Sequence, residues 1–166
     1  MALTTSGSSA DSYATLIEAD NYADNHFVGS DFTAWDGATD PDKEARLRQA
    51  AQWLDANFRS RYVGIIRSES QALEWPRSGA IDRSGRTINN VPDAVKNAQI
   101  ELAKYMIVNS ANLVPAEDRG GQVKREKVGP IEVEYMDNAP SGTTYRWAEQ
   151  LLSQVLGSSV RRVVRV

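Results

Sequence analysis

Residues 121–136 read GQVKREKVGPIEVEYM, and this stretch carries the clearest strand pattern in the chain. After the turn-forming pair at positions 129 and 130, apolar residues at 131, 133 and 135 alternate with glutamates, which is the period of two of a half-buried strand. The stretch therefore predicts a β-hairpin over residues 122–136. Since a lone hairpin is only marginally stable in water, it needs a helix layer or another chain to cover it.

Outside this stretch, apolar residues recur at spacings of three and four, which is typical of helices. Thr15 and Glu18 fit a capping box that opens a helix from Leu16 to about Phe27. Asp40 is the expected N-cap of a second helix over about 41–59, because the proline that follows it suits a first helical position. A loop carrying Phe32 and Trp35 is expected between these two helices.

A third helix begins at Pro92 and runs to about Ser110, and no helical period persists from Arg61 to Asn90. A fourth helix ends at Gly157 and uses four apolar residues: Ala148, Leu151, Leu152 and Val155. The predicted fold is mainly α, a four-helix bundle-like domain with one β-hairpin and extended N- and C-terminal arms. The expected boundaries are an arm at 1–14, the helical domain at 15–157 with its hairpin at 122–136, and a tail at 158–166.

The length of 166 residues suits one domain, with 41% hydrophobic and 25% charged residues. The formal net charge of −3 does not favour generic duplex binding through a basic surface. The chain has no cysteine, so it has neither disulfides nor thiolate metal sites. No signal-peptide pattern and no apolar run of transmembrane length occurs, so we expect a soluble protein without membrane contact.

Catalytic patterns are missing from the sequence. The single histidine, His26, follows the first helix's apolar spacing and is expected at the core edge or on the surface. The glycine pair at 120–121 lacks the spacing of a phosphate-binding P-loop. We therefore expect no enzyme, no metal and no cofactor.

Three features have two interpretations each. Trp75, held by Pro76 in an irregular segment, is either a core plug or an anchor at a subunit interface. The cations Lys124, Arg125 and Lys127 are either solvated or in contact with a phosphate or an acidic neighbour. The tail at 158–166 is either disordered or, from its valine and arginine content, a docking segment.

Three segments together resemble a known family: ALEWPR at 72–77, VPDAV at 91–95 and VKREKVGPIEVEY at 123–135. They are similar to a family of small phage proteins labelled "putative DnaT-like single-stranded-DNA-binding protein", and the likeness covers about residues 10–157. In size, helix order and hairpin placement, the chain also resembles head–tail connector (adaptor) proteins of tailed bacteriophages.

The resemblance to adaptors implies a structural virion protein, made in the host cytoplasm and located at the head–tail junction. It would form a ring, expected to hold twelve copies, between the portal protein and a downstream tail or nozzle component. Genomic DNA would pass through the channel without sequence-specific binding. Portal docking is then expected at Val160, Arg161, Arg162, Val163, Val164, Arg165 and Val166. A subunit or tail interface is expected at Trp75, Arg77, Lys124, Arg125, Lys127, Ile131, Val133 and Tyr135.

The alternative is a single-stranded-DNA-binding replication accessory. Such binding needs aromatic platforms interleaved with a basic groove. In this chain the four tryptophans lie in different predicted elements, and the hairpin's cations are matched by glutamates. On these grounds the sequence favours the adaptor interpretation over single-strand binding.

Overall fold

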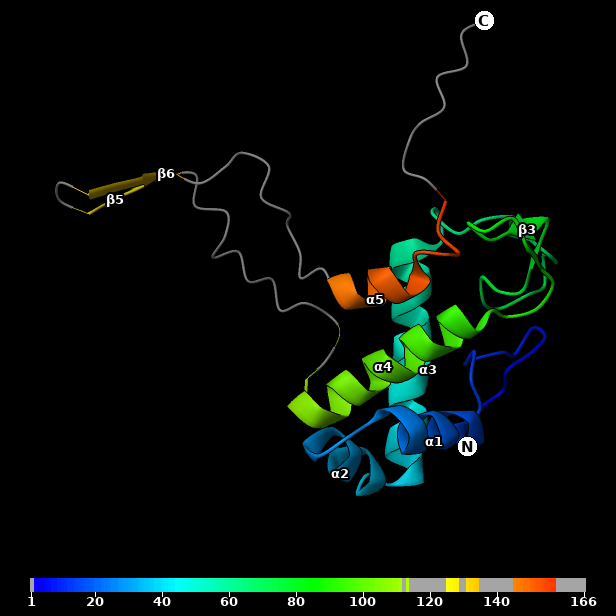
Figure 1. Cartoon of the computed structure of the whole chain (residues 1–166), viewed down its shortest axis with the longest axis horizontal. Helices are drawn as coiled ribbons and strands as arrows, with labels where there is room; N and C mark the ends of the chain where they lie inside the picture. The colour runs from blue at the N-terminus through cyan, green and yellow to red at the C-terminus, as the bar shows by residue number, and fades with distance from the viewer. Residues whose placement is uncertain (1, 112, 114–124, 129–130, 135–144, 158–166) are drawn as a thin grey trace, which may run out of the picture. The chain divides into compact units, whose positions relative to one another are not determined.

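The computed structural model describes residues 2–111, 113, 125–128, 131–134 and 145–157 (Figure 1). The chain divides into two compact units, of which the first comprises Met1–Leu113 with Trp147–Val166 and the second Val114–Arg146. The predicted tail at 158–166 lies outside the described residues. Within the described ranges, no helix combines the length and the apolar character that crossing a bilayer requires.

The fold is mainly helical, as predicted. Five helices are described, namely α1 (Leu16–His26), α2 (Ser30–Asp36), α3 (Asp40–Phe58), α4 (Asp93–Asn109) and α5 (Arg146–Leu152) (Figure 1). Four of them lie where the hydrophobic spacing places them. The fourth predicted helix, here α5, already ends at Leu152, and Leu151 is partly exposed instead of buried.

Helix α2 replaces the predicted loop around Phe32 and Trp35, so that prediction was wrong. Seven residues are too few to show a helical period, and tertiary contacts stabilise the helix instead. Trp35 is 1% exposed, its indole N–H donates to the Asp20 carboxylate at 2.9 Å, and its ring packs edge-on against Phe27. The helix therefore forms around one buried tryptophan.

The helix caps follow the sequence closely. The predicted capping box is confirmed, since the Thr15 hydroxyl accepts the Glu18 N–H at 3.1 Å while the Glu18 carboxylate accepts the Thr15 N–H at 2.8 Å. For α3 the N-cap is Thr39, whose hydroxyl accepts the N–H of Asp42, and Asp40 is already helical. The expected cap at Asp40 was therefore one residue late.

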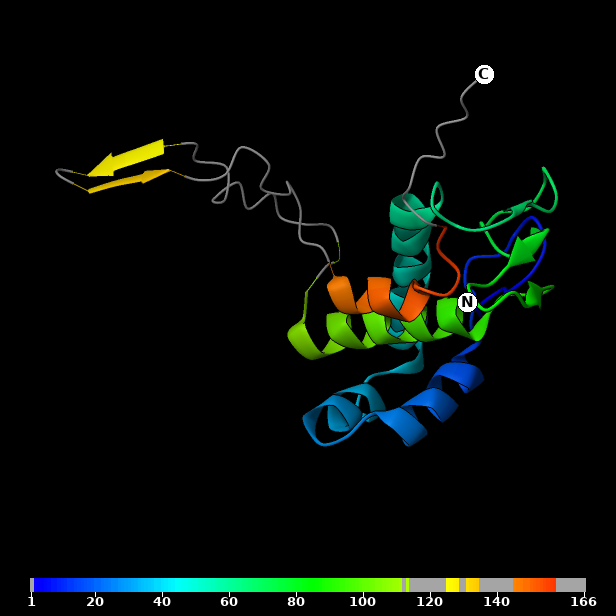
Figure 2. The same cartoon turned by 45° about the horizontal axis from the view of Figure 1, so that its top comes forward.

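The core forms where α3 crosses α4, and α1 and α2 pack beside them (Figure 2). At its centre the side chain of Gln99 is fully buried and makes four hydrogen bonds. Its carbonyl accepts the N–H groups of Tyr13 and Ala14, and its amide donates to the Ser12 hydroxyl and the Leu47 carbonyl. Residues 12–14, expected in the N-terminal arm, are thereby tied into the helical core.

Short antiparallel strand pairs complete the described structure. In the irregular part of the chain, β1 (Ile65–Ile66) pairs with β2 (Arg77–Ser78), and β3 (Ala80–Ile81) pairs with β4 (Thr87–Ile88). We call residues 59–90 the β1–β4 segment. In the second unit β5 (Arg125–Val128) pairs with β6 (Ile131–Glu134), with Val128 opposite Ile131. The strand pairing of the predicted hairpin is confirmed, while its turn residues at 129–130 lie outside the described residues.

Candidate functional site

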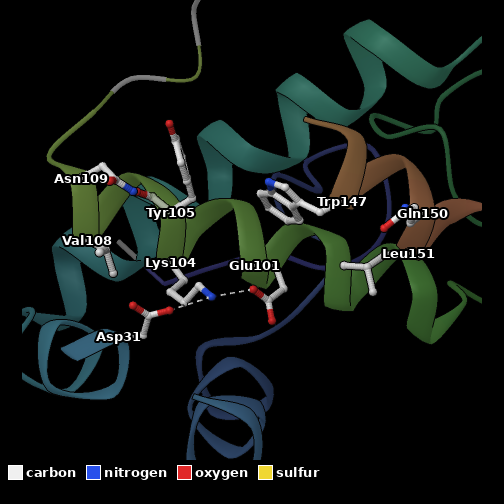
Figure 3. A pocket seen from close by; sticks show the side chains of 9 residues that line it. All are labelled: Asp31, Glu101, Lys104, Tyr105, Val108, Asn109, Trp147, Gln150 and Leu151. Carbon is white, nitrogen blue, oxygen red and sulfur yellow. Dashed lines mark hydrogen bonds and ion pairs between the residues drawn. The ribbon is translucent and has the colours of Figure 1, made fainter. Parts of the chain in front are cut away.

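A groove of about 680 Å³ lies between α4 and α5 in the first unit (Figure 3). The groove-lining residues of α4 recur at helical spacing and so share one face of the helix. This face lies beside the buried face that packs on α3. The lining side chains are Asp31 from α2, Glu101, Lys104, Tyr105, Val108 and Asn109 from α4, and Trp147, Gln150 and Leu151 from α5. The groove thus depends on how two helices distant in sequence pack together.

An aromatic pair forms part of the wall. The ring centroids of Tyr105 and Trp147 lie 6.5 Å apart at an interplanar angle of 43°, and both side chains are half-buried (Figure 3). Val108 and Leu151, each 36% exposed, extend the apolar surface. Exposed aromatic faces in a groove are the surfaces on which nucleic-acid bases stack.

Among the described residues that line the groove, the one cation, Lys104, is neutralised by its neighbours. The Lys104 ammonium lies 2.9 Å from the Glu101 carboxylate and 3.1 Å from that of Asp31 (Figure 3). It also lies over the ring of Phe27. Burial alone would lower the pKa of Lys104, but the hydrogen bonds to both carboxylates outweigh it and raise the pKa. With two acids and one base, the groove suits a neutral ring better than a phosphate.

Arg77 is buried and links several groups within the β1–β4 segment through hydrogen bonds. Its guanidinium donates to the carbonyls of Val63 at 3.0 Å and Gly64 at 2.9 Å, and to the Glu74 carboxylate at 2.7 Å. Trp75, two positions earlier, is 2% exposed and packs edge-on against Tyr62. The family-like ALEWPR segment therefore holds this part of the fold together from inside.

A buried carboxylate links this segment to the helices. Asp55 on α3 accepts the hydroxyl of Tyr13 and, at 3.1 Å, the backbone N–H of Glu74. Burial raises the pKa of Asp55 to about 6, although both hydrogen bonds act against that shift. It also raises the pKa of Tyr13 far above its ordinary value. Both groups are enclosed, so their role is to hold elements together.

The predicted interface residues belong to different parts of the chain, and some of them lie outside the described residues. Trp75 and Arg77 lie in the interior of the first unit, as the core-plug interpretation of Trp75 expects. Arg125, Lys127, Ile131 and Val133 lie on the β5–β6 hairpin, of which the backbone alone is described. The following lie outside the described residues: Lys124, Tyr135, Val160, Arg161, Arg162, Val163, Val164, Arg165 and Val166.

Sequence reasoning missed the Tyr105–Trp147 pair. The two residues belong to helices that the hairpin stretch separates, so no local spacing joins them. A signal was present, because Tyr105 falls outside the buried stripe of Val95, Leu102 and Met106 on its helix. In the part of the chain that the structure describes, no cluster of histidine and carboxylate side chains could hold a metal ion.

A protein-family model matches the chain over residues 1–166, and its description reads "Putative DnaT-like ssDNA binding protein". No curated protein and no solved structure matches the chain. The comparison with known proteins therefore rests on the family match.

This match corrects the functional interpretation drawn from the sequence. It names single-stranded-DNA binding and supports neither a head–tail adaptor nor portal, tail, virion or DNA-channel partners, so that interpretation was wrong. The error arose because scattered tryptophans were taken as evidence against stacking, whereas packing places Trp147 beside Tyr105. Since the match spans every residue, the chain belongs to the family described as "Putative DnaT-like ssDNA binding protein".

Proposed function

We propose that this protein binds single-stranded DNA and that bases stack in the α4–α5 groove. The observation that carries the proposal is the aromatic pair of Tyr105 and Trp147, half-buried in the wall of a groove of about 680 Å³. Stacking on such side chains tolerates any base, because every base has a π-face. The family description supports the same activity.

The rest of the groove also fits a base. Val108 and Leu151 offer apolar contact, while the amides of Asn109 and Gln150 can donate to and accept from base edges. Lys104 is already held by two carboxylates, so the described residues of the lining carry a net negative charge. A phosphate would be repelled there, whereas a neutral ring would not.

The test is the affinity of the full chain for a fluorescein-labelled oligothymidylate of about 16 nucleotides, followed by fluorescence anisotropy at low salt. We expect Tyr105→Ala and Trp147→Ala each to weaken binding. One lost stacking contact is worth about 1–3 kcal/mol, which corresponds to a rise in Kd of about 5- to 150-fold. Trp147→Phe keeps a ring and should recover most of the loss.

Trp53→Ala is the matched control, because Trp53 is also half-buried but lies on α3 and does not line the groove. It should leave the Kd unchanged. Far-UV circular dichroism and the Tm of each variant separate loss of binding from loss of folding. Absence of oligonucleotide binding by the wild-type chain at low salt would overturn the proposed function. If Trp53→Ala weakens oligonucleotide binding as much as the groove variants do, the groove is not the binding site.

A further inference from the structure

Positive charge is concentrated in the β1–β4 segment. Residues 59–90 hold six arginines and three carboxylates, a net charge of +3, whereas residues 1–58 hold three cations and ten carboxylates, a net charge of −7. The net charge of −3 for the whole chain conceals this separation. A polyanion that approaches the first unit is therefore attracted to the β1–β4 segment and repelled by the charges of the first three helices.

The β3–β4 turn carries two of these arginines at its tip. Asp82 holds the turn in shape, because its carboxylate accepts the backbone N–H groups of Ser84 and Arg86 at 2.9 Å and the Arg86 Nε at 2.8 Å. The side chain of Arg86 is nevertheless 72% exposed, and Arg83 is exposed as well. Arg86 has further N–H donors beyond that single bond, so the turn presents guanidinium groups suited to a phosphate.

The chain at the end of α5 joins this turn to the groove. The backbone N–H of Arg83 donates to the carbonyl of Gln154 at 3.1 Å. On α5, Trp147, Gln150 and Leu151 line the groove, and the exposed Gln154 follows two residues after the helix ends at Leu152. The chain that follows α5 therefore connects the helix of Trp147 to the turn of Arg83.

A second contact fastens α5 to the β1–β4 segment. The guanidinium of Arg61 donates to the Glu149 carboxylate at 2.5 Å, and the backbone N–H of Gly157 donates to the Arg61 carbonyl at 2.6 Å. These bonds hold residues 149 and 157, on either side of the Gln154 contact with the turn, to Arg61. They keep the spacing of the two features constant, as recognition of one continuous strand requires.

We propose that Arg83 and Arg86 bind the phosphodiester backbone of the same single strand whose bases stack on Tyr105 and Trp147. The inference rests on the proposed function and adds a path for the strand, along the exposed side of α5. The groove takes bases because its own lysine is neutralised. The turn takes phosphates because its arginines are exposed and lie in the positively charged segment.

The experiment measures oligothymidylate binding by the full chain over a series of salt concentrations. For single strands, each neutralised phosphate contributes about 0.7 to the slope of log K against log salt. We therefore expect Arg83→Gln and Arg86→Gln each to reduce the steepness of that slope by about 0.7, and the double variant by about 1.4. Trp147→Ala should weaken binding without changing the slope.

Arg46→Gln is the matched control, because it removes one positive charge from α3 within the acidic first part of the chain. Its slope should equal that of the wild type. If the double variant keeps the wild-type slope while the wild type binds, the path along α5 is wrong and the stacking function stands. The same holds if Arg46→Gln loses as much slope as Arg83→Gln. If the wild type does not bind at all, both proposals fail.

Discussion

At the scale of the residue, Asp55 shows how one buried carboxylate joins distant parts of the chain. It lies on α3, accepts the hydroxyl of Tyr13 from the N-terminal segment, and accepts the backbone N–H of Glu74 from the β1–β4 segment. The cost of enclosing this charge is visible in its pKa, which burial raises from 3.8 to about 6. Because burial outweighs the hydrogen bonds, Asp55 contributes most to the stability of the fold when its carboxyl is protonated.

That shift predicts a pH dependence with a definite sign. Between pH 3.8 and about 6 the folded protein holds the Asp55 proton while the unfolded chain releases it, so this carboxyl's contribution to stability falls as the pH rises. The two pKa values differ by about two units, which corresponds to a loss on the order of 3 kcal/mol.

The measurement is urea denaturation of the wild type and of Asp55→Asn across this pH range. Asparagine does not titrate, so the variant should become more stable relative to the wild type as the pH increases. Titration of the other carboxyls, such as Asp11 and Glu18, cancels in the difference between the two proteins. Parallel stability curves for the two proteins would contradict the prediction.

At the scale of the element, the β1–β4 segment packs through backbone contacts as well as side chains. Gly64 has a φ of +75°, and a Cβ at this position would lie 2.7 Å from the Ser78 carbonyl oxygen and 2.9 Å from the Ala80 Cα. Two backbone atoms thus occupy the space that a side chain would need. A glycine is required here both for its conformation and for the close approach of β2 and β3.

Gly79 allows the two requirements to be separated. Its φ is +65°, but a Cβ there would meet nothing within 4 Å. We expect Gly79→Ala to lower the free energy of unfolding by about 1–2 kcal/mol through backbone strain alone. Gly64→Ala should cost about 1–3 kcal/mol more, because the new methyl group clashes with backbone that cannot rotate away. Denaturant unfolding of both variants measures the difference, and equal losses would show that the close approach is not rigid.

The predictability of the elements follows from where their stabilising contacts lie. The hairpin pairing and the first turn of α1 depend on residues within a few positions of one another, so alternation and the Thr15–Glu18 box were sufficient. Helix α2 depends on Trp35 finding Asp20 and Phe27, which its own seven residues do not reveal. The β1–β4 segment depends on Arg77 reaching carbonyls 13 and 14 positions earlier in the chain.

At the scale of the whole molecule, the proposed binding of single-stranded DNA agrees with the distribution of charge and aromatic surface. The chain carries a net charge of −3, and its first 58 residues carry −7, so phosphates alone gain little from approaching it. In a duplex the bases are stacked inside and cannot reach Tyr105 and Trp147. Discrimination between single and double strands should therefore come from stacking.

The corresponding prediction compares a single strand with a duplex of equal length. We expect the single strand to bind about 5- to 150-fold more tightly, the equivalent of one stacked base. A competition experiment monitored by anisotropy measures the ratio, and Trp147→Ala should bring it closer to one. A duplex that competes as well as the single strand would contradict this reading of the groove.

Taken by itself, the sequence determined the helical class of this protein, most helix bounds and the β5–β6 hairpin, because hydrophobic period, caps and turns act over short distances. For Trp75 the sequence left a core plug and an interface anchor both open, and the structure buries the side chain. Only the tertiary structure decided which side chains meet across elements. Tyr105 and Trp147 come together because α5 packs on α4, and Arg83 adjoins the end of that helix through a backbone hydrogen bond. Contacts between segments far apart in the chain depend on packing geometry, which no local pattern encodes.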